Sequence, residues 1–348
     1  MTSASLTWLE RGDDGVDAIA AMVDRFELEA GLRLHWVARH HLVHGSGRED
    51  DPFPRVEEHI GYLFGIVYVP SNPNDTIAEF DELVFVATHD RVIGSFKRSG
   101  NSVTTWSSLF DSVSSDAIFT DQEQAGGRGL VRMMKTVVKQ LLADAEHFSA
   151  HLNRVADDSG IFSTGADFGN ALDALEDISH RQRRELQSLA SRNRDMVSRL
   201  RRQLPLMRRV IVETENILQR LANDEIDLKA DVNGAERQLF NREMEIFVAD
   251  IHVDARHVTS LVSDIDDGLN LLVDYMKQLR QEESVSASRF TGAIASIMLV
   301  PTFIVGLYGQ NFETIPELSW AKGYWFSWAV IVLVTVGQLI FFRRRRWI

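Results

Sequence analysis

Two side-chain amides, Gln310 and Asn311, directly follow a long uncharged segment, and their oxygens are the first candidates for chemistry in this sequence. A ring of amide carbonyls can hydrogen-bond the water shell of a hydrated cation without trapping the ion as carboxylates would. Mg²⁺ gives up its waters reluctantly, so a site for the hydrated ion is physically reasonable. Gly309 permits a turn or a close approach just before the amides. Glu313 and Glu317 follow them, so a cation that arrives there meets a mildly negative mouth.

Two segments without a single charge, residues 290–308 and 324–342, lie on either side of this mouth. A helix of that length covers ~28 Å, which is close to the thickness of the hydrocarbon core of a membrane. A pair of buried helices in a soluble core is the alternative. Aromatic residues cluster where both segments meet the connecting loop, as in the belts at membrane interfaces, and this favours two membrane spans.

The orientation of the spans follows from the basic tail, residues 343–348, which begins with Arg343, Arg344, Arg345 and Arg346. By the positive-inside rule these arginines hold the C-terminus in the cytoplasm. Two spans then return the N-terminal body to the cytoplasm as well, and only the loop 311–323 faces outward. We therefore expect a multi-pass protein of the plasma or inner membrane.

Small or weakly polar side chains recur every three or four residues along the first span, which places them on one helix face: Ser288, Thr291, Ala295, Leu299 and Thr302. Two membrane helices cannot enclose an aqueous path. Conduction would therefore require several copies of the chain around an axis, each contributing one helix to the wall. Close packing of small residues inside a bundle is the other interpretation of the same face.

The composition excludes several classes of function. The chain has 348 residues, no cysteine and a formal net charge of −13, so thiolate metal sites are excluded and binding to nucleic acid is disfavoured. No phosphate-binding loop of the GxxxxGK[ST] type is present, and neither a GxSxG nor an HExxH motif occurs. The sequence thus gives no support to an enzyme or to a nucleotide-driven pump.

The body before the spans divides into two parts. Residues 1–145 predict an α+β cytoplasmic domain, with helix over 17–44 and strands over 55–69 and 82–96. Residues 146–286 predict a cytoplasmic helical stalk, and 287–348 form the transmembrane domain. The long helical pattern begins near Leu130 after a Gly-Gly pair, with expected breaks at 157–165, at Leu204-Pro205 and at 231–234.

A single very long helix is expected from about residue 235 to residue 308, where it becomes the first span. Such a helix needs packing partners along its length to be stable in water. Apolar side chains at steps of three and four form a packing stripe for that purpose: Val258, Leu261, Ile265, Leu269, Leu272, Met276 and Leu279.

The block TFIVGLYGQNFETIPELSW, the second span and the ending RRRRWI together resemble the CorA family of divalent cation transporters. The resemblance implies a homopentamer with a funnel-shaped cytoplasmic domain, a pore lined by the long helix, and an outer selectivity ring at Asn311. It also implies a pore-side acidic ring at Asp274. Asp250 falls on a stalk acid that helps to bind regulatory Mg²⁺ between subunits, so that internal Mg²⁺ closes the pore.

Two departures from the family pattern stand out. Gln310 replaces the signature methionine, which adds a second amide at the entry. An acidic pair of the N-terminal domain is missing, because its neighbourhood contains Ala38, Arg39 and His40. Arg39 could therefore pair with Asp250 directly, or Asp254 with the nearby histidines His252 and His257 could form another regulatory site.

The sequence thus favours passive, channel-like uptake of Mg²⁺, with Co²⁺ or Ni²⁺ as further cargo, driven by the membrane potential. The predicted partners are other copies of the chain, the lipid bilayer and divalent cations; no catalytic cofactor is expected. Transport of Zn²⁺ by the same fold is one alternative. A membrane-anchored scaffold or sensor that conducts nothing is another.

Overall fold

The computed structural model describes residues 2–3, 6–11, 16–47, 52–71, 79–99, 125–158, 180–226, 228, 239–310, 320–345 and 347. The chain forms two compact units. The first comprises Met1–Ala174 with Leu189–Leu272, and the second comprises Leu175–Ser188 with Val273–Ile348. Each unit is described by itself.

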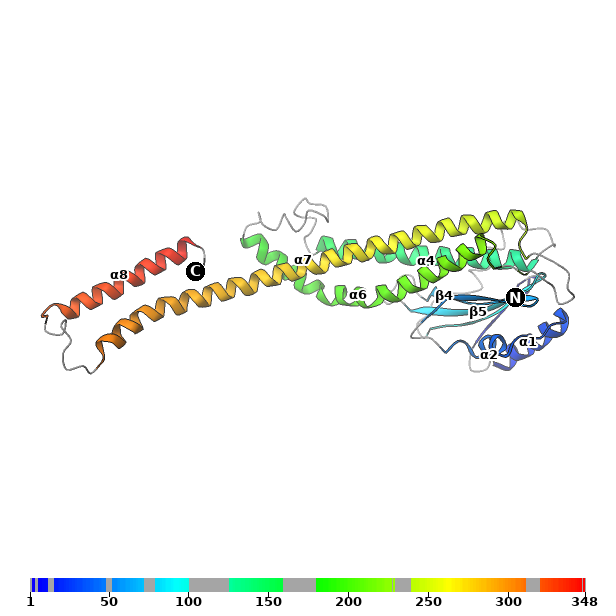
Figure 1. Ribbon diagram of the computed structural model, residues 1–348, viewed down its shortest axis with the longest axis horizontal. Helices are drawn as coiled ribbons and strands as arrows, with labels where there is room; N and C mark the ends of the chain where they lie inside the picture. The colour runs from blue at the N-terminus through cyan, green and yellow to red at the C-terminus, as the bar shows by residue number, and fades with distance from the viewer. Residues whose placement is uncertain are drawn as a thin grey trace. The chain divides into compact units, whose positions relative to one another are not determined.

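A six-stranded mixed sheet is the centre of the first unit (Figure 1). Its order is β1-β2-β6-β5-β4-β3, and among the described strands only β2 and β6 pair in parallel. The strands are β1 (Thr2–Ser3), β2 (Leu6–Glu10), β3 (Arg55–His59), β4 (Tyr62–Pro70), β5 (Phe80–Ala87) and β6 (Val92–Lys97). The predicted strands at 55–69 and 82–96 are thereby confirmed. The first segment forms the antiparallel pair β3 and β4, and the second forms the antiparallel pair β5 and β6.

Central strands covered on both faces read as apolar runs, and β4 and β5 follow this rule because nearly every residue in them is buried. Packing across the sheet is tight enough to require glycine at Gly94 of β6, which lies opposite Trp8 of β2. A Cβ atom at Gly94 would come within 1.7 Å of the Trp8 indole ring. The missing side chain therefore makes room for the indole.

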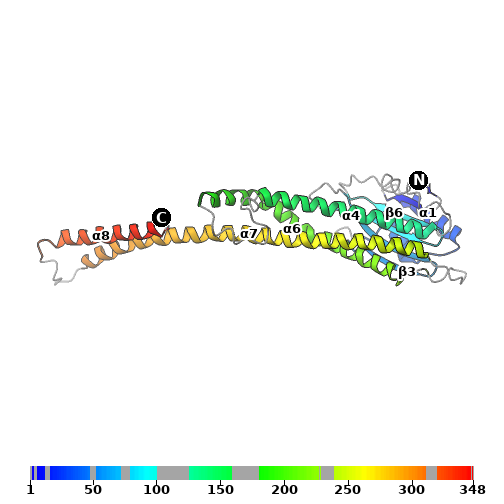
Figure 2. The ribbon, with the colours of Figure 1, turned by 90° about the horizontal axis from the view of Figure 1, so that it is seen from above.

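Helices cover both faces of the sheet (Figures 1 and 2). α1 (Val16–Ala30) and α2 (Trp36–His44) pack together on one side, and α4 (Ala125–Asp158) packs on β4, β5 and β6 from the other. α4 begins earlier than the predicted Leu130. Gly126 and Gly127 lie in its first turn. Glycine is required at both positions, because a Cβ atom would come within 1.7 Å of the Thr88 carbonyl at Gly126 and within 2.1 Å of the Leu239 carbonyl at Gly127.

α6 (His180–Ala222) runs without interruption through Pro205, so the predicted break at Leu204-Pro205 is wrong. A proline inside a helix costs about 3 kcal/mol. Leu204 and Met207 on either side of it are buried, and each such side chain contributes about 1.5–3 kcal/mol when buried. Pro205 itself is exposed, so water can reach the carbonyl that loses its donor. The predicted break at 231–234 lies outside the described residues.

α7 (Arg242–Tyr308) has 67 residues and is the expected long helix, about 100 Å in length. Most of the predicted packing stripe in the first unit is buried, namely Val258, Ile265, Leu269 and Leu272. Two further contacts add to this packing. The Thr259 hydroxyl donates a hydrogen bond to Glu215 of α6 at 2.6 Å, and Gly268 lies against the apolar side chain of Leu152 of α4. α7 therefore has packing partners along its part in the first unit, as a helix of that length requires.

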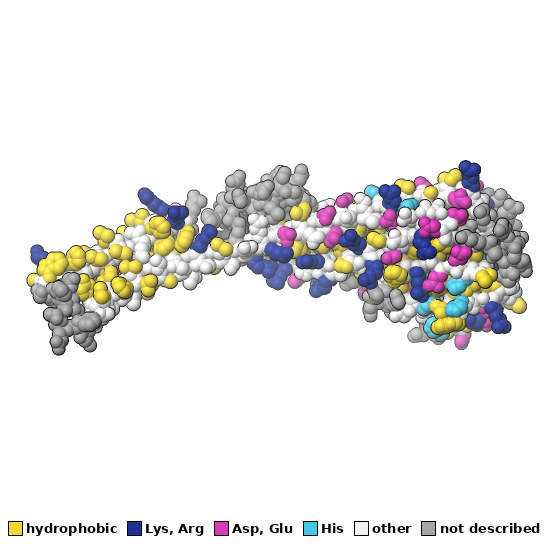
Figure 3. Space-filling model, viewed as in Figure 1, with side chains coloured by type: hydrophobic (Ala, Val, Ile, Leu, Met, Phe, Trp, Pro, Cys, Tyr) yellow, Lys and Arg dark blue, Asp and Glu magenta, His cyan; other side chains and the backbone are white. Residues whose placement is uncertain are grey.

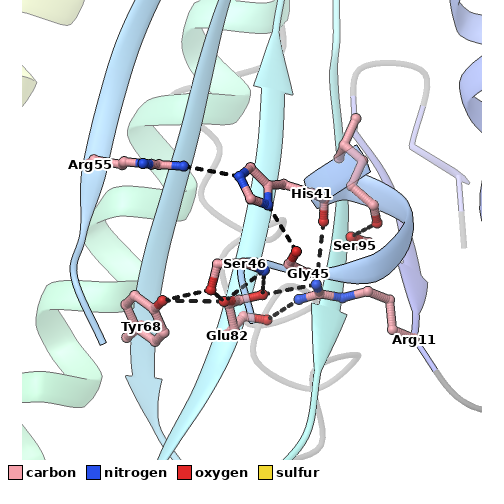
Figure 4. A network of polar contacts seen from close by, with 9 residues as sticks. Arg11, His41, Gly45, Ser46, Arg55, Tyr68, Glu82 and Ser95 are labelled. Carbon is pink, nitrogen blue, oxygen red and sulfur yellow. Dashed lines mark hydrogen bonds and ion pairs between the residues drawn. The ribbon is translucent and has the colours of Figure 1, made fainter. Parts of the chain in front are cut away.

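A buried ion pair ties β2 to β5 (Figure 4). Arg11 and Glu82 approach to 2.8 Å, and both side chains are about 5% exposed. Ser46 and Tyr68 also donate hydrogen bonds to the Glu82 carboxylate. Burial alone would raise the pKa of Glu82, but the charge of Arg11 and the hydrogen bonds from Ser46 outweigh it and hold that pKa below its usual value. Gly45 fits beside the pair because a Cβ there would come within 2.3 Å of the Arg11 guanidinium.

We expect Glu82→Ala to lower the free energy of unfolding by about 3–5 kcal/mol, because it leaves the Arg11 guanidinium buried without its carboxylate. Denaturant unfolding of the purified chain measures the loss. The matched control is Glu10→Ala, which removes one side of an exposed pair with Arg98 and should cost at most about 1 kcal/mol. Equal losses in the two variants would contradict the role of burial.

Asp144 of α4 is a buried carboxyl, 7% exposed. Burial raises the pKa of Asp144 to about 7. A carboxyl with a raised pKa in the folded state binds more protons folded than unfolded, so its contribution favours folding below the unfolded pKa and is lost as the pH rises through about 7.

Asp144→Asn should therefore stabilise the chain at pH 8 by up to about 4 kcal/mol, since one unit of pKa corresponds to about 1.4 kcal/mol. The gain should shrink as the pH falls toward 5. Unfolding experiments at the two pH values test this, with Asp157→Asn in the exposed last turn of α4 as control. A gain independent of pH would show that the Asp144 charge is not what matters.

Candidate ion pathway

Two helices of the second unit are long and apolar enough to cross a membrane, Ser284–Tyr308 within α7 and Gly323–Arg344, which is α8. They coincide with the predicted spans. Only a small share of their side chains is buried within the chain, so they present apolar side chains outward (Figure 3). An apolar helix pair with little internal burial fits a lipid environment better than the core of a soluble protein.

α8 lies alongside the end of α7 (Figures 1 and 2). The side-chain amide of Gln338 on α8 donates to the backbone carbonyl of Ser296 at 3.3 Å and to its hydroxyl at 3.4 Å. The sequence interpretation did not single out this contact. The amide of Gln338 within an otherwise apolar span could have predicted such a contact, because polar groups in a bilayer favour hydrogen-bond partners on neighbouring helices.

The face of α7 turned toward α8 is identified by its low exposure. Ala293 is fully buried, and the other less exposed side chains continue from it at steps of three and four. They are Ser296, Ile297, Val300, Pro301 and Ile304. This covered face contains only one hydroxyl, that of Ser296, which is the partner of Gln338.

The predicted pore-lining side chains occupy the opposite face of the same helix. Ser288, Thr291, Ala295, Leu299 and Thr302 are all exposed in the single chain. The Thr291 hydroxyl donates to the Ala287 carbonyl at 3.0 Å, and the Thr302 hydroxyl donates to the Met298 carbonyl at 2.7 Å. With the protons used inside the helix, the oxygen lone pairs are left as acceptors. This open face suits contact with the water shell of a cation.

The outer end of α7 closes with Gly309, whose N–H donates to the Val305 carbonyl at 2.9 Å. Gln310 follows in a turn and is exposed. Asn311, Glu313 and Glu317, the remaining predicted residues of the mouth, lie outside the described residues. The structure therefore brings α7 to the predicted mouth, and the amide ring stays a prediction.

Asp274, the predicted pore-side acid, is exposed on α7 and pairs with Lys277 of the next turn at 2.8 Å. Both side chains are more than half exposed, so the pair contributes little to stability. The Asp274 carboxylate can exchange this partner for a cation at small cost.

The predicted regulatory acids, Asp250 and Asp254, are exposed on one face of α7, one helical turn apart. The apolar side chains Ile246 and Val253 are exposed beside them, 65% and 61% respectively. No cluster of three or more potential metal ligands occurs within the residues that the structure describes.

Within the single chain Arg39 pairs with acids other than Asp250, so its suggested pairing with Asp250 of another copy stays a prediction. Arg39 lies on α2 and binds two acids of α1, Asp24 at 2.5 Å and Glu27 at 2.8 Å. These hydrogen bonds, that to Asp24 first, raise the pKa of Arg39. Its neighbour Ala38 is buried in the core of the domain. Arg39 thus joins the two helices on its own side of the sheet. His252, proposed as a metal ligand, lies instead 4.0 Å from Glu215 of α6.

Aromatic and basic side chains flank α8 as predicted for a span. Trp320, Tyr324, Trp325 and Trp328 at its beginning are exposed, which is typical of a membrane interface. At its end Arg343, Arg344 and Arg345 are exposed, and Arg346 lies outside the described residues. The Trp347 ring stacks on Phe342 with 5.5 Å between the centroids, so the tail folds back against the helix.

A family model described as CorA-like Mg²⁺ transporter protein matches residues 39–344. The chain belongs to this family. The solved CorA magnesium transporter of Methanocaldococcus jannaschii superposes with a TM-score of 0.64 at 14% identity, covering 99% of this chain and 91% of that one, which shows that the fold is shared.

Two curated relatives agree with the family. The cobalt/magnesium transport protein CorA of Thermotoga maritima is 27% identical over 110 residues, 32% of this chain and 31% of the relative. The magnesium transport protein CorA of Wolinella succinogenes is 26% identical over 190 residues, 55% of this chain and 48% of the relative. The aligned segments thus span less than half the length of either relative.

Proposed function

We propose that several copies of this CorA-family chain surround a water-filled axis lined by α7, and that divalent cations, chiefly Mg²⁺, pass along it into the cytoplasm. The observation that carries the proposal is the division of α7 into two faces. α8 covers one face, and the face with Ser288, Thr291 and Thr302 is exposed. Hydroxyl groups are costly in contact with lipid, so an aqueous axis between copies is a favourable environment for that face.

The number of copies we propose is five, on the strength of the resemblance to the family. The curated relatives in Thermotoga maritima and Wolinella succinogenes are described as transport proteins for cobalt and magnesium or for magnesium, which supports cations of this class as cargo. The basic end of α8 supports the orientation with both termini in the cytoplasm.

Selection among ions falls to Asn311, with Gln310 beside it. Neutral amide oxygens can hold the first water shell of Mg²⁺ by hydrogen bonds and release it again, since the ion need not be dehydrated. The extra amide of Gln310 also leaves room for transition metals such as Zn²⁺, which accept nitrogen and oxygen ligands. Zn²⁺ is therefore the second candidate cargo.

The membrane potential supplies the driving force. One elementary charge that crosses the membrane gains about 2.3 kcal/mol per 100 mV, so a divalent cation gains about 4.6 kcal/mol. This favours uptake without a nucleotide, in accord with the lack of a phosphate-binding loop in the sequence.

Regulation belongs to the exposed acids of α7 in the first unit. We propose that Asp250 and Asp254 of neighbouring copies share Mg²⁺ and that this bound ion holds the pore closed. Their exposure and the neighbouring apolar side chains Ile246 and Val253 support contact with a second copy.

Asn311→Ala should reduce discrimination between Mg²⁺ and larger divalent ions and lower Mg²⁺ influx at least tenfold at micromolar external Mg²⁺, because the amide that holds the hydrated ion is gone. Influx into proteoliposomes with an internal Mg²⁺ indicator measures both effects. Asn311→Gln, which keeps an amide, is the matched control. Unchanged influx and selectivity in Asn311→Ala would contradict the amide ring.

Replacing both Asp250 and Asp254 by Asn should leave Mg²⁺ influx active at millimolar internal Mg²⁺, where the unmodified protein closes, because the shared ligands lose their charge. Influx as a function of internal Mg²⁺ gives the measurement. Asp264 and Asp267, an exposed acid pair farther along α7, provide the matched double Asn control. If both double variants close like the unmodified protein, the regulatory site lies elsewhere.

A further inference from the structure

Gln338 stands out because it is a polar side chain inside an apolar span. In the described residues its two hydrogen bonds to Ser296 are the only side-chain hydrogen bonds that join α7 to α8. Both are long for N–H···O bonds, so the contact is weak and reversible. A hydrogen bond between membrane helices fixes one relative rotation, whereas apolar contacts tolerate several.

The contact lies next to the proline of α7. Pro301 has no N–H, so the carbonyl of Ile297, four residues earlier, lacks its usual helical donor. Gln338 binds the Ser296 carbonyl, which directly precedes this weakened turn. A side chain that holds the helix at the point where it bends most easily can decide how the following turns are oriented.

Rotation is the property that matters for a pore. Ser296 follows Ala295 of the proposed pore face, and successive residues of a helix are about 100° apart. Holding Ser296 against α8 therefore turns Ala295 and Leu299 away from α8. A rotation of α7 by about 100°, the angle between neighbouring residues, would replace Ala295 on the axis by Ile294, which is 45% exposed.

Thr335 provides an internal comparison. It lies on the same face of α8, three residues before Gln338, and its hydroxyl is covered. In the part of the chain that the structure describes, this hydroxyl has no hydrogen-bond partner. Both residues are thus polar and lie on the same face of α8, and of the two only Gln338 donates a hydrogen bond to α7 in the described residues.

We propose that Gln338 is a positioning residue of the ion pathway, which fixes the rotation of the α7 pore face through Ser296 at the Pro301 turn. This inference rests on the proposed function, since it presupposes that the face with Ala295 and Leu299 lines a pore.

The chain has no cysteine, so single cysteines can be introduced into the otherwise unmodified protein. We would compare Ala295→Cys on the proposed pore face with Ile294→Cys beside it, in liposomes, by their rates of reaction with a charged methanethiosulfonate reagent. A thiol in an aqueous pore reacts much faster than a thiol in lipid, so the rate at 295 should greatly exceed the rate at 294.

Adding Gln338→Met, an apolar side chain of similar length, should lower the ratio of the two rates about threefold, the factor that corresponds to an average interhelical hydrogen bond in a membrane. Thr335→Val should leave the ratio unchanged. Ser296→Ala, which removes only the hydroxyl acceptor, should shift the ratio in the same direction by less. If Gln338→Met fails to assemble, as judged by size-exclusion chromatography, the Ser296→Ala ratio decides.

The outcomes distinguish the proposed pore face from the proposed role of Gln338. Equal rates at 294 and 295 in the unmodified background would overturn the pore face and the role of Gln338 together. A high ratio that Gln338→Met, or Ser296→Ala in its place, leaves unchanged would overturn the role of Gln338 and leave the pore face standing. A fall of the ratio with Thr335→Val as well would show general loosening of α8 and would also overturn the specific role.

Discussion

A polar group that a chain places in a lipid bilayer costs free energy unless it has a partner, and this constraint governs how the two membrane helices can be used. On one face of α7, Ser296 accepts a hydrogen bond from Gln338. On the other face, the hydroxyls of Thr291 and Thr302 donate their protons to backbone carbonyls of the same helix. The remaining acceptors lie on the side that α8 leaves open. Two helices cannot cover that side, so the open face of a single chain is suited to contact with further copies around an aqueous axis.

The first unit gives α7 the packing partners that such a long helix requires. α4 packs on the sheet, and α7 in turn buries Val258, Ile265 and Leu269 and bonds to Glu215 of α6. Within the sheet domain, the buried Arg11 and Glu82 side chains pair with each other at 2.8 Å. A firmly packed first half of α7 is a precondition for the regulation proposed for the exposed acids Asp250 and Asp254, which requires that a change there be transmitted along the helix.

Much of this architecture was predictable from local pattern alone. The uncharged spans, the strands at 55–69 and 82–96 and the packing stripe of α7 follow from hydrophobic periodicity. The errors arose where packing between distant segments decided the outcome. Burial of Leu204 and Met207 keeps α6 helical through Pro205, and the close approach of Thr88 and Leu239 requires glycine at the start of α4. Of the mouth, the pattern predicted Gly309 and Gln310 at the end of α7, but the partner of Gln338 depends on helix rotation, which sequence spacing does not fix.

The central claim is that copies of the chain enclose an aqueous path for divalent cations. The most direct test is influx of Mg²⁺ into proteoliposomes that contain the purified, unmodified protein, measured while a K⁺ gradient sets the membrane potential. The account predicts influx that increases as the interior becomes more negative and that needs no nucleotide. Inserted, oligomeric protein that admits no more Mg²⁺, Co²⁺ or Zn²⁺ than protein-free vesicles at any potential would contradict it.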